Sequence, residues 1–505
     1  MTPKSRALLV VPPLLKYSAG PLLGPTLLAS AARARGHEAT VLDLNIRFIQ
    51  AHLPQRAAPT PSIVVGDHDK PGALLSDLQR DIFTSLLREA LTGVEPIEGA
   101  DPYLTLTCSH DDIERAVERL AQSAPGTAMK SALEAQPEPH VFGVSVLFSG
   151  QVLFGLVASL MARSLWPGVR VVWGGPHVTA LQDRIAADAR FGRIVDAFVF
   201  GYAERTFADL LDATARGEPM PAGCVRAGQR AIVRADDDPT HAPYFQDLDL
   251  YGMPRLTLPA QLSRGCSYGR CGFCTYPTIE GAYRPIRGDS IEPIVRLAED
   301  LNATIAMKDS LVLPARLSEM AARIAGRARW SACTKINRGF GPELFKEIAR
   351  GGCDTLEIGL ETIDPDSQKL IEKRQSIDLF LRTLDAAAAS GVGLVINYIT
   401  GFPGTSRQDG ERELHWLRKS IEERRPALRA IIEHNDFQLE RLSPMAARPA
   451  AFGLRVTGEW PWASVLRWDA AEEPPRARRL AMVSQDGSHP VARTGVALKS
   501  SSGNR

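Results

Sequence analysis

Short apolar runs alternate with amphipathic helical stretches along the second half of the chain, and this order constrains the fold more than any other sequence feature. The pattern predicts strands at 257–263, 303–309, 329–335, 355–361, 394–400 and 430–436. Gly351-Gly352 and Gly391 stand where the intervening helices should end. Because strand–helix repeats give a parallel sheet covered by helices, we predict a partial (β/α)6 barrel over residues 257–440.

The first 210 residues show a second series of strand–helix repeats. Strands are predicted at 7–11, 39–42, 141–146, 169–173 and 197–200, with helices at 23–34 and 151–165. This order predicts an α/β, Rossmann-like, doubly wound parallel sheet, which binds ligands at the carboxyl ends of its strands. A dinucleotide site should carry Gly-x-Gly-x-x-Gly after the first strand. Pro12-Pro13 follows that strand instead, which disfavours a nucleotide, while a sheet that binds nothing stays open.

Three other segments lie around these two units. Residues 45–138 are charged and proline-rich, with predicted helices near 73–93 and 110–135, and we interpret them as an insertion into the sheet domain. Residues 211–256 are predicted to be a linker. Residues 441–505 are predicted to form an irregular C-terminal extension, with a disordered tail from Ser484.

Length and charge limit the class of protein. A chain of 505 residues should hold two or three domains. Its net charge of +1 gives no reason to expect nucleic acid or a charged membrane surface as a partner. No apolar run reaches the ~20 residues that span a bilayer, and Val10-Val11-Pro12-Pro13 interrupts any signal-peptide core. We therefore expect a cytoplasmic protein without a membrane partner.

Three cysteines, Cys266, Cys271 and Cys274, lie within nine residues and directly after the first predicted strand of the barrel. Three clustered thiolates without a fourth suit a 4Fe-4S cluster with one open iron. A structural zinc ion would need four protein ligands. Cys224 and Cys333 are distant in sequence, and no histidine occurs between 242 and 414, so zinc is the weaker alternative. A catalytic thiol would explain only one of the three cysteines.

This run resembles the cluster-binding loop of the radical S-adenosylmethionine (SAM) superfamily, whose usual pattern is C-x-x-x-C-x-x-C with an aromatic residue before the last cysteine. Phe273 fills the aromatic position beside the cofactor, whereas four residues rather than three separate Cys266 from Cys271. The resemblance implies that the open iron holds SAM. It also implies that one electron from the cluster yields a 5′-deoxyadenosyl radical able to abstract hydrogen from an unactivated carbon.

Further positions in the barrel resemble SAM contacts of this superfamily. Glu361 ends the fourth predicted strand, where relatives have a glutamate that binds the ribose hydroxyls. Gly401 begins a turn similar to the one on the adenine side. Residues 308–310 and either Lys335 or Arg338 follow the second and third strands, where relatives contact the methionyl carboxylate and amine.

The N-terminal sheet resembles the cobalamin-binding domain of one large subfamily. The matching positions are Pro12, Ser145, Gly174, Gly175, Thr179, Gly201 and Glu204. Tyr202 and Ala203 depart from the Gly-Glu-Gly-Glu segment of that subfamily. No Asp-x-His-x-x-Gly motif occurs, and the run Asp67-His68-Asp69 has the wrong spacing to replace it, so we expect no histidine below the cobalt. We interpret His177 as a packing or polar-contact residue.

Taken together, these resemblances imply a cobalamin-dependent radical SAM enzyme, most simply a C-methyltransferase (a transferase) that acts on a natural product or modified peptide. One SAM would methylate cobalamin, a second would form the radical, and a flavodoxin or ferredoxin would donate electrons. Cyclisation, ring contraction, oxidation and a non-catalytic metal-bearing binding protein stay open as alternatives.

Some residues are left without a role at this point. No catalytic acid or base is assigned, because Asp309, Asn397, Tyr398 and Glu433 are equally available by position. Residues 441–445 resemble a segment of peptide-modifying relatives. Trp460, Trp462 and Trp468 are candidates for a substrate wall, although aromatic residues are more commonly part of a core.

Overall fold

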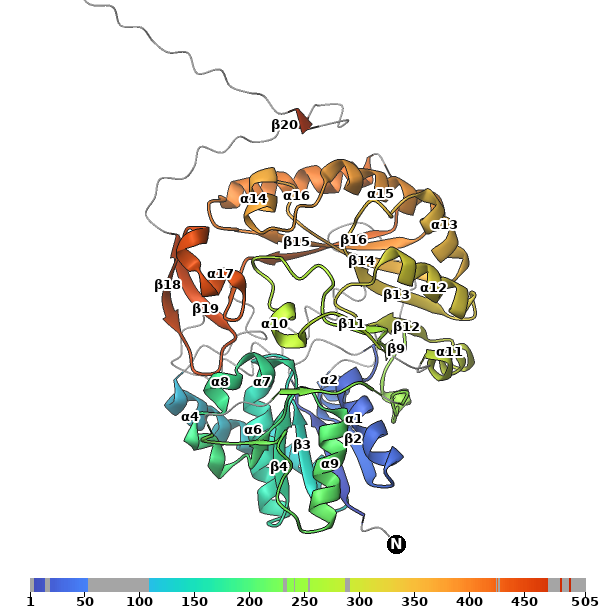
Figure 1. Cartoon of the computed structure of the whole chain (residues 1–505). Helices are drawn as coiled ribbons and strands as arrows, with labels where there is room; N and C mark the ends of the chain where they lie inside the picture. The colour runs from blue at the N-terminus through green and yellow to red at the C-terminus, as the bar shows by residue number, and fades with distance from the viewer. Residues whose placement is uncertain are drawn as a thin grey trace, which may run out of the picture.

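The computed structural model describes residues 4–13, 19–52, 109–229, 234–239, 241–252, 255–286, 291–423, 425, 427–470, 482–483 and 490–491. Two mainly parallel sheets dominate these residues. Figure 1 shows the N-terminal sheet and the barrel as two bodies with the short helix α10 (Tyr276–Glu280) between them. The expected helix near 73–93, the Asp67–Asp69 run and the expected tail from Ser484, apart from Pro490–Val491, lie outside the described residues.

The N-terminal sheet has the order β2-β1-β3-β4-β5-β7. Its strands are β1 (Arg6–Val11), β2 (Glu38–Asp43), β3 (Val141–Ser145), β4 (Arg170–Gly174), β5 (Ala197–Phe198) and β7 (Val225–Arg226). The first five pair in parallel and β7 pairs antiparallel to β5. The prediction of a doubly wound sheet is therefore confirmed, with its order reversing between β1 and β3.

Helices cover both faces of this sheet. Alternate residues of β1 enter two different cores: Leu8 and Val10 enter one, and Ala7 and Leu9 enter the other. The first core is closed by α2 (Leu44–His52), α4 (His110–Gln122), α5 (Ala124–Glu134) and α6 (Gln151–Leu165), and the second by α1 (Leu23–Ala34) and α9 (Glu204–Ala215). Helices α4 and α5 replace the single helix expected near 110–135, because Ser123 ends one helix and caps the next.

The segment expected to be a linker adds strands to the N-terminal unit. It supplies β7 at the sheet edge and β8 (Arg234–Asp236), which pairs in parallel with β6 (Phe200–Tyr202). Strands this short carry almost no periodic signal. Helix η2 (Leu248–Leu250) then leads to the barrel.

The barrel sheet has the order β16-β15-β14-β13-β12-β9, with every neighbouring pair parallel. Its strands are β9 (Thr257–Ala260), β12 (Thr304–Met307), β13 (Arg329–Thr334), β14 (Cys353–Glu361), β15 (Gly393–Thr400) and β16 (Ala430–Asp436). Since β9 and β16 are the two edges, the sheet is an open, partial barrel, in agreement with the sequence pattern.

One side of this sheet is covered by helices and the other is polar. The covering helices are α11 (Ile291–Asp300), α12 (Pro314–Ile324), α13 (Pro342–Arg350), α14 (Pro365–Leu370), α15 (Ile377–Ser390) and α16 (Arg407–Glu422). Trp330, Leu356 and Ile396 are fully buried in the core that faces these helices. Glu357 and Asn397 alternate with such residues and reach water on the inner side of the barrel.

The C-terminal extension is more regular than expected up to residue 470. It forms the antiparallel sheet β17-β19-β18, from Leu439–Glu440, Val465–Ala470 and Leu454–Glu459, with α17 (Pro444–Ala447) and η3 (Pro449–Phe452) between strands. Trp462 stacks on Phe191 of η1 (Ala189–Arg193) with 3.9 Å between ring centroids. The expectation of an irregular segment was wrong there, and Trp462 is a core residue.

Among the helices formed by the described residues, none has the length and apolar character required to cross a membrane.

Candidate functional site

The three cysteines lie on the loop that follows β10 (Ser263–Arg264), at the carboxyl rim of the barrel. The loop is fastened to two other segments: the Gly272 amide donates to the Ile371 carbonyl at 2.8 Å, and the Met445 amide donates to the Gly272 carbonyl at 2.9 Å. The Gly269 amide lies 3.5 Å from Cys266 Sγ. The barrel and the C-terminal extension thus hold the path of the loop from both sides.

The three thiols of this loop are the candidate ligands of an iron–sulfur cluster. Within the described ranges, no three His, Cys, Asp or Glu side chains converge closely enough to hold one metal ion. An iron–sulfur cluster is wider, since each thiolate binds its own iron. Burial raises the pKa of Cys271 and raises that of Cys274 to about 12, while Lys373 opposes both shifts. The thiols of Cys271 and Cys274 are therefore protonated without metal, and metal binding would release their protons.

Tyr268 lies in the four-residue segment between Cys266 and Cys271, which is one residue longer than in the usual pattern. Its hydroxyl donates to the Glu372 carbonyl and, at 3.2 Å, to the Lys373 carbonyl. The Lys335 ammonium lies 4.5 Å from the centre of the Tyr268 ring. Gly269, with φ of +60°, then turns the chain back toward Cys271. The longer loop is thus stabilised by contacts of its own.

Glu361 ends β14 in a conformation that a non-glycine residue seldom adopts, with φ of +69° after a register shift against β15. Its carboxylate is buried and accepts a 2.8 Å hydrogen bond from Lys373 Nζ. A Cβ at Gly359 would lie 2.4 Å from Lys373 Nζ and 2.5 Å from Glu361 Oε1. A side chain at Gly359 would therefore displace the charged ends of Lys373 and Glu361 and disturb their ion pair.

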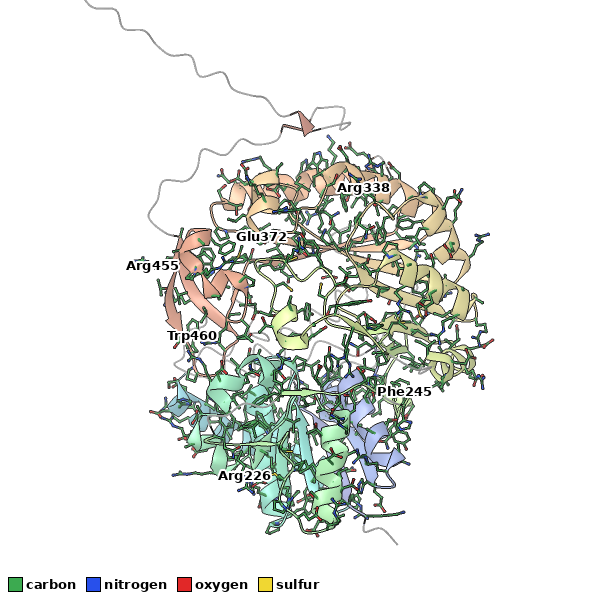
Figure 2. The ribbon with its side chains drawn as sticks, viewed as in Figure 1. Arg226, Phe245, Arg338, Glu372, Arg455 and Trp460 are labelled. Carbon is green, nitrogen blue, oxygen red and sulfur yellow. The ribbon has the colours of Figure 1, made fainter. Side chains whose placement is uncertain are left out.

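Two lysines bring positive charge to the cysteine loop. Burial by itself would lower the pKa of Lys373, but the negative charges of Glu361 and Cys271 outweigh burial and raise that pKa above its ordinary value. Burial and the neighbouring Lys373 lower the pKa of Lys335. Arg338, the alternative to Lys335, is exposed (Figure 2). Lys373 was missed in the sequence, because its pairing depends on the turn at Glu372 and Arg374, which both have positive φ.

Among the other expected SAM contacts, Gly401 has free space beside it, whereas Phe273 and Asp309 contact other residues of the chain. Gly401 has φ of +75°, and a Cβ there would meet nothing within 4 Å, so the turn offers open backbone. Phe273 packs edge-on against Phe402 at 6.1 Å. Asp309 is buried and accepts from the Ser263 hydroxyl at 2.6 Å, which ties the end of β12 to the cysteine loop. Asp309 therefore has a structural partner.

Not all the residues considered as a catalytic acid or base lie on the inner side of the barrel. Tyr398 is buried on the helix side, where its hydroxyl donates to Glu413, so it does not face the inner side. Asn397 donates to Glu357 Oε1 at 2.7 Å on the inner side, and Glu433 lies opposite Asn397 in the neighbouring strand. Burial raises the pKa of the nearby Tyr276 hydroxyl, and Glu280, Cys274 and Glu357 add to the increase.

Hydrogen bonds between side chains and backbone groups hold the carboxyl edge of the N-terminal sheet together. The Pro12 carbonyl accepts from Gln151 Nε2 at 2.8 Å, and the Gly201 amide donates to Thr179 Oγ1 at 3.0 Å. Gly175 has φ of +106°, and a Cβ there would lie 2.5 Å from the Val146 carbonyl oxygen. Pro12, Thr179 and Gly175 therefore shape the edge from within.

Other residues of this edge remain accessible. Ser145 and Gly174 are half-buried at the ends of β3 and β4, and Phe148 is 41% exposed on the loop after β3. Backbone together with an exposed aromatic ring suits a large, flat ligand. His177, in α7 (Pro176–Ala180) before α8 (Gln182–Ile185), is buried and its Nε2 lies 3.0 Å from the Trp462 carbonyl oxygen. Burial lowers its pKa to about 4, so it is a packing residue, as expected.

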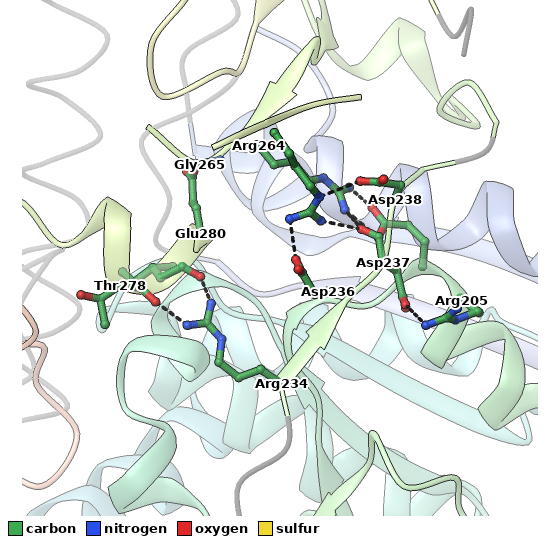
Figure 3. A network of polar contacts seen from close by, with 12 residues as sticks. Arg205, Arg234, Asp236, Asp237, Asp238, Arg264, Gly265, Thr278 and Glu280 are labelled. Carbon is green, nitrogen blue, oxygen red and sulfur yellow. Dashed lines mark hydrogen bonds and ion pairs between the residues drawn. The ribbon is translucent and has the colours of Figure 1, made fainter. Parts of the chain in front are cut away.

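Glu204 faces the cysteine loop instead of open space. It begins α9 and forms a buried ion pair with Arg264, two residues before Cys266. Figure 3 shows part of the surrounding network, in which Arg264 lies beside Asp237 and donates to its backbone carbonyl. The sequence singled out both motifs, but nothing in it indicated that they meet.

Comparison with known proteins agrees with this geometry. Residues 261–417 match the radical SAM superfamily. The match spans the cysteine loop and most of the barrel. An uncharacterized methyltransferase of Pyrococcus horikoshii is 25% identical over 310 residues, which cover 56% of this chain and 64% of the relative. The chain thus aligns with less than two thirds of that relative.

Solved structures resemble almost the whole chain. The radical SAM methyltransferase TsrM from Kitasatospora setae, with cobalamin and a [4Fe-4S] cluster bound, has a TM-score of 0.56 at 16% identity, covering 90% of this chain and 81% of TsrM. The cobalamin-dependent radical SAM enzyme OxsB, with aqua-cobalamin bound, has a TM-score of 0.59 at 14% identity, covering 92% of this chain and 64% of OxsB. The chain therefore has the fold of cobalamin-dependent radical SAM enzymes.

Proposed function

We propose that this chain is a cobalamin-dependent radical SAM methyltransferase that C-methylates an unactivated carbon of a natural product or modified peptide. The observation that carries the proposal is the meeting of two edges. The cysteine loop lies at the carboxyl rim of the barrel, and the carboxyl edge of a doubly wound sheet faces it across α10. When bound, the cluster and SAM supply a radical and cobalamin supplies methyl transfer.

The chain's own residues have distinct roles in this proposal. Cys266, Cys271 and Cys274 hold the cluster, and Glu361, kept in place by Lys373, accepts the ribose hydroxyls. Lys335 lies near the methionyl group, and the open turn at Gly401 accommodates the adenine. Ser145, Gly174 and Phe148 contact cobalamin at the sheet edge. The two facing edges exclude water from the reacting atoms.

A product assay tests the reaction class. The protein, reconstituted anaerobically with iron, sulfide and hydroxocobalamin, is given SAM, dithionite and an extract of the producing cells. Methyl transfer predicts both S-adenosylhomocysteine and 5′-deoxyadenosine, because one SAM gives a methyl group and another gives the hydrogen-abstracting group. Formation of 5′-deoxyadenosine alone would favour cyclisation, ring contraction or oxidation. A cytoplasmic location and a flavodoxin or ferredoxin as electron donor are parts of the same proposal.

A further inference from the structure

Two segments separated by 60 residues meet at a single guanidinium group. Arg264 is the last residue of β10 and stands two residues before Cys266. Its partner Glu204 is the first residue of α9, which follows β6 (Phe200–Tyr202) after Ala203 alone. One segment leads to the cluster thiols and the other belongs to the carboxyl edge of the N-terminal sheet. The contact therefore joins the two edges that face each other.

Arg264 is held on several sides. Its side chain is 1% exposed, and Nη1 and Nη2 donate to Glu204, with 3.3 Å from Nη1 to Oε2. Nη1 also donates to the Asp237 carbonyl, and the guanidinium lies 3.8 Å from the centre of the Tyr202 ring. A buried charge is tolerated only when it is paired and hydrogen-bonded. The planar donors of arginine match such a site in a way that a lysine ammonium does not.

The chain has little freedom between this clamp and the cluster thiols. Gly265 has φ of +71°, and a Cβ there would lie 2.7 Å from the backbone of Ala282. Its amide donates to Glu280 Oε2 at 3.1 Å. Cys266 follows directly, so a shift of the Arg264 side chain would move the first thiol.

The sheet side of the clamp is equally constrained. A Cβ at Gly201 would lie 2.3 Å from the Ala235 carbonyl oxygen. Asp237 accepts from the Thr206 amide at 2.8 Å and from its hydroxyl at 3.0 Å, which fixes the start of α9. Arg264 thus touches a rigid loop on each side.

Other contacts also hold the two units together, and one of them reaches the helix that follows the cysteine loop. Arg234 donates to the carbonyls of Thr278 and Ile279 on α10. Arg264 differs from Arg234 because only one residue separates it from a proposed cluster ligand. A pair needed only to join the two units would not have to lie at this position.

We propose that Arg264 is a positioning residue that couples the cluster loop to the junction of β6 and α9 at residues 201–204, so that SAM bound at the cluster changes the affinity of the sheet edge for cobalamin. The inference rests on the proposed function. Energetic coupling between two sites is reciprocal and ordinarily amounts to about 5- to 150-fold in affinity. The shared guanidinium supplies the physical element that both sites would bias.

Equilibrium binding of hydroxocobalamin tests this coupling without any turnover. The full chain carries an oxidised cluster, no reductant is added, and the dissociation constant is measured by absorbance with and without saturating SAM. We expect the two constants of the wild type to differ at least about fivefold. In Arg264→Lys, which keeps the charge but loses the paired donors, we expect the ratio to approach one while iron content is retained.

Two further variants keep the test decisive. Arg205→Lys is the matched control, because Arg205 is exposed and forms an ion pair with Asp237 at 3.0 Å that a lysine can keep, and it should keep the wild-type ratio. If Arg264→Lys loses its cluster, Tyr202→Leu removes the stacking and keeps the ion pair, and it should also lower the ratio. If the wild type binds hydroxocobalamin equally well with and without SAM, the coupling is refuted but the proposed function is not. The same conclusion holds if the Arg264 and Tyr202 variants keep the wild-type ratio of dissociation constants. A wild type that binds no hydroxocobalamin would overturn the proposed function itself.

Discussion

The rim of the barrel and the facing edge of the N-terminal sheet use their residues in different ways. At the rim, side chains present the chemistry: three thiols, the Glu361–Lys373 pair and the Lys335 ammonium. At the sheet edge, Gly175 lies against the Val146 backbone and the Thr179 hydroxyl accepts a hydrogen bond from the Gly201 amide, so both residues contact the edge itself. A site built from side chains can be broken by removing a functional group, whereas a site built from backbone is broken by adding atoms.

The largest expected effect comes from the thiols. Cys266→Ala, Cys271→Ala and Cys274→Ala should each abolish retention of iron and sulfide after anaerobic reconstitution, because each thiolate holds one iron. Cys224→Ala is the control, since Cys224 is buried in the core of the N-terminal sheet and should keep its full iron content. Full iron in all three variants would refute the cluster assignment.

The ion pair beside the rim should come next. Lys373→Met leaves the buried carboxylate of Glu361 without a partner, which should lower the free energy of unfolding by about 3–5 kcal/mol and weaken SAM binding. Lys369→Met is a matched control, because Lys369 is exposed on α14. Denaturant unfolding and equilibrium dialysis with SAM measure the two effects. Equal behaviour of both variants would show that the pair does not support the site.

A substitution that adds atoms to the sheet edge should disturb the proposed cobalamin site and leave the cluster site intact. Gly175→Ala places a Cβ against the Val146 carbonyl in a strained conformation, which should cost about 3 kcal/mol of stability and weaken hydroxocobalamin binding. Its iron content should stay that of the wild type. Gly168→Ala is the control, because a Cβ there meets nothing within 4 Å. Loss of iron in Gly175→Ala would mean that the two sites are not separable in this way.

Much of this comparison was predictable, because strands and helices in both units follow regular apolar periods and the cysteine spacing is local. The sequence also singled out Glu361, Gly174, Gly175 and Gly201, whose roles in binding stay predictions. It did not indicate Lys373 or the Glu204–Arg264 pair, since these contacts form between distant segments. Strands β7 and β8 and the C-terminal sheet were missed because they are short or pair antiparallel at an edge.

His177 gives the smallest effect and concerns acid stability. Its pKa is about 4 when folded and about 6.5 when unfolded, so the unfolded chain binds the extra proton first as the pH falls. The contribution of neutral His177 to the free energy of unfolding is fully present above pH 6.5 and decreases as the pH falls toward 4. At pH 5 the loss is roughly 2 kcal/mol. His177→Gln should therefore lose less stability than the wild type between pH 7 and pH 5 in denaturant unfolding. Parallel pH profiles would contradict the assigned burial.

Metal analysis of the purified chain tests the central claim most directly. The protein is produced anaerobically with cobalamin supplied, passed through a desalting column, and assayed for iron, sulfide, cobalt and zinc. The account predicts about four irons and four sulfides per chain together with an equimolar amount of cobalt. Zinc in place of iron, or iron without any cobalt, would contradict the claim that two cofactor sites face each other in one chain.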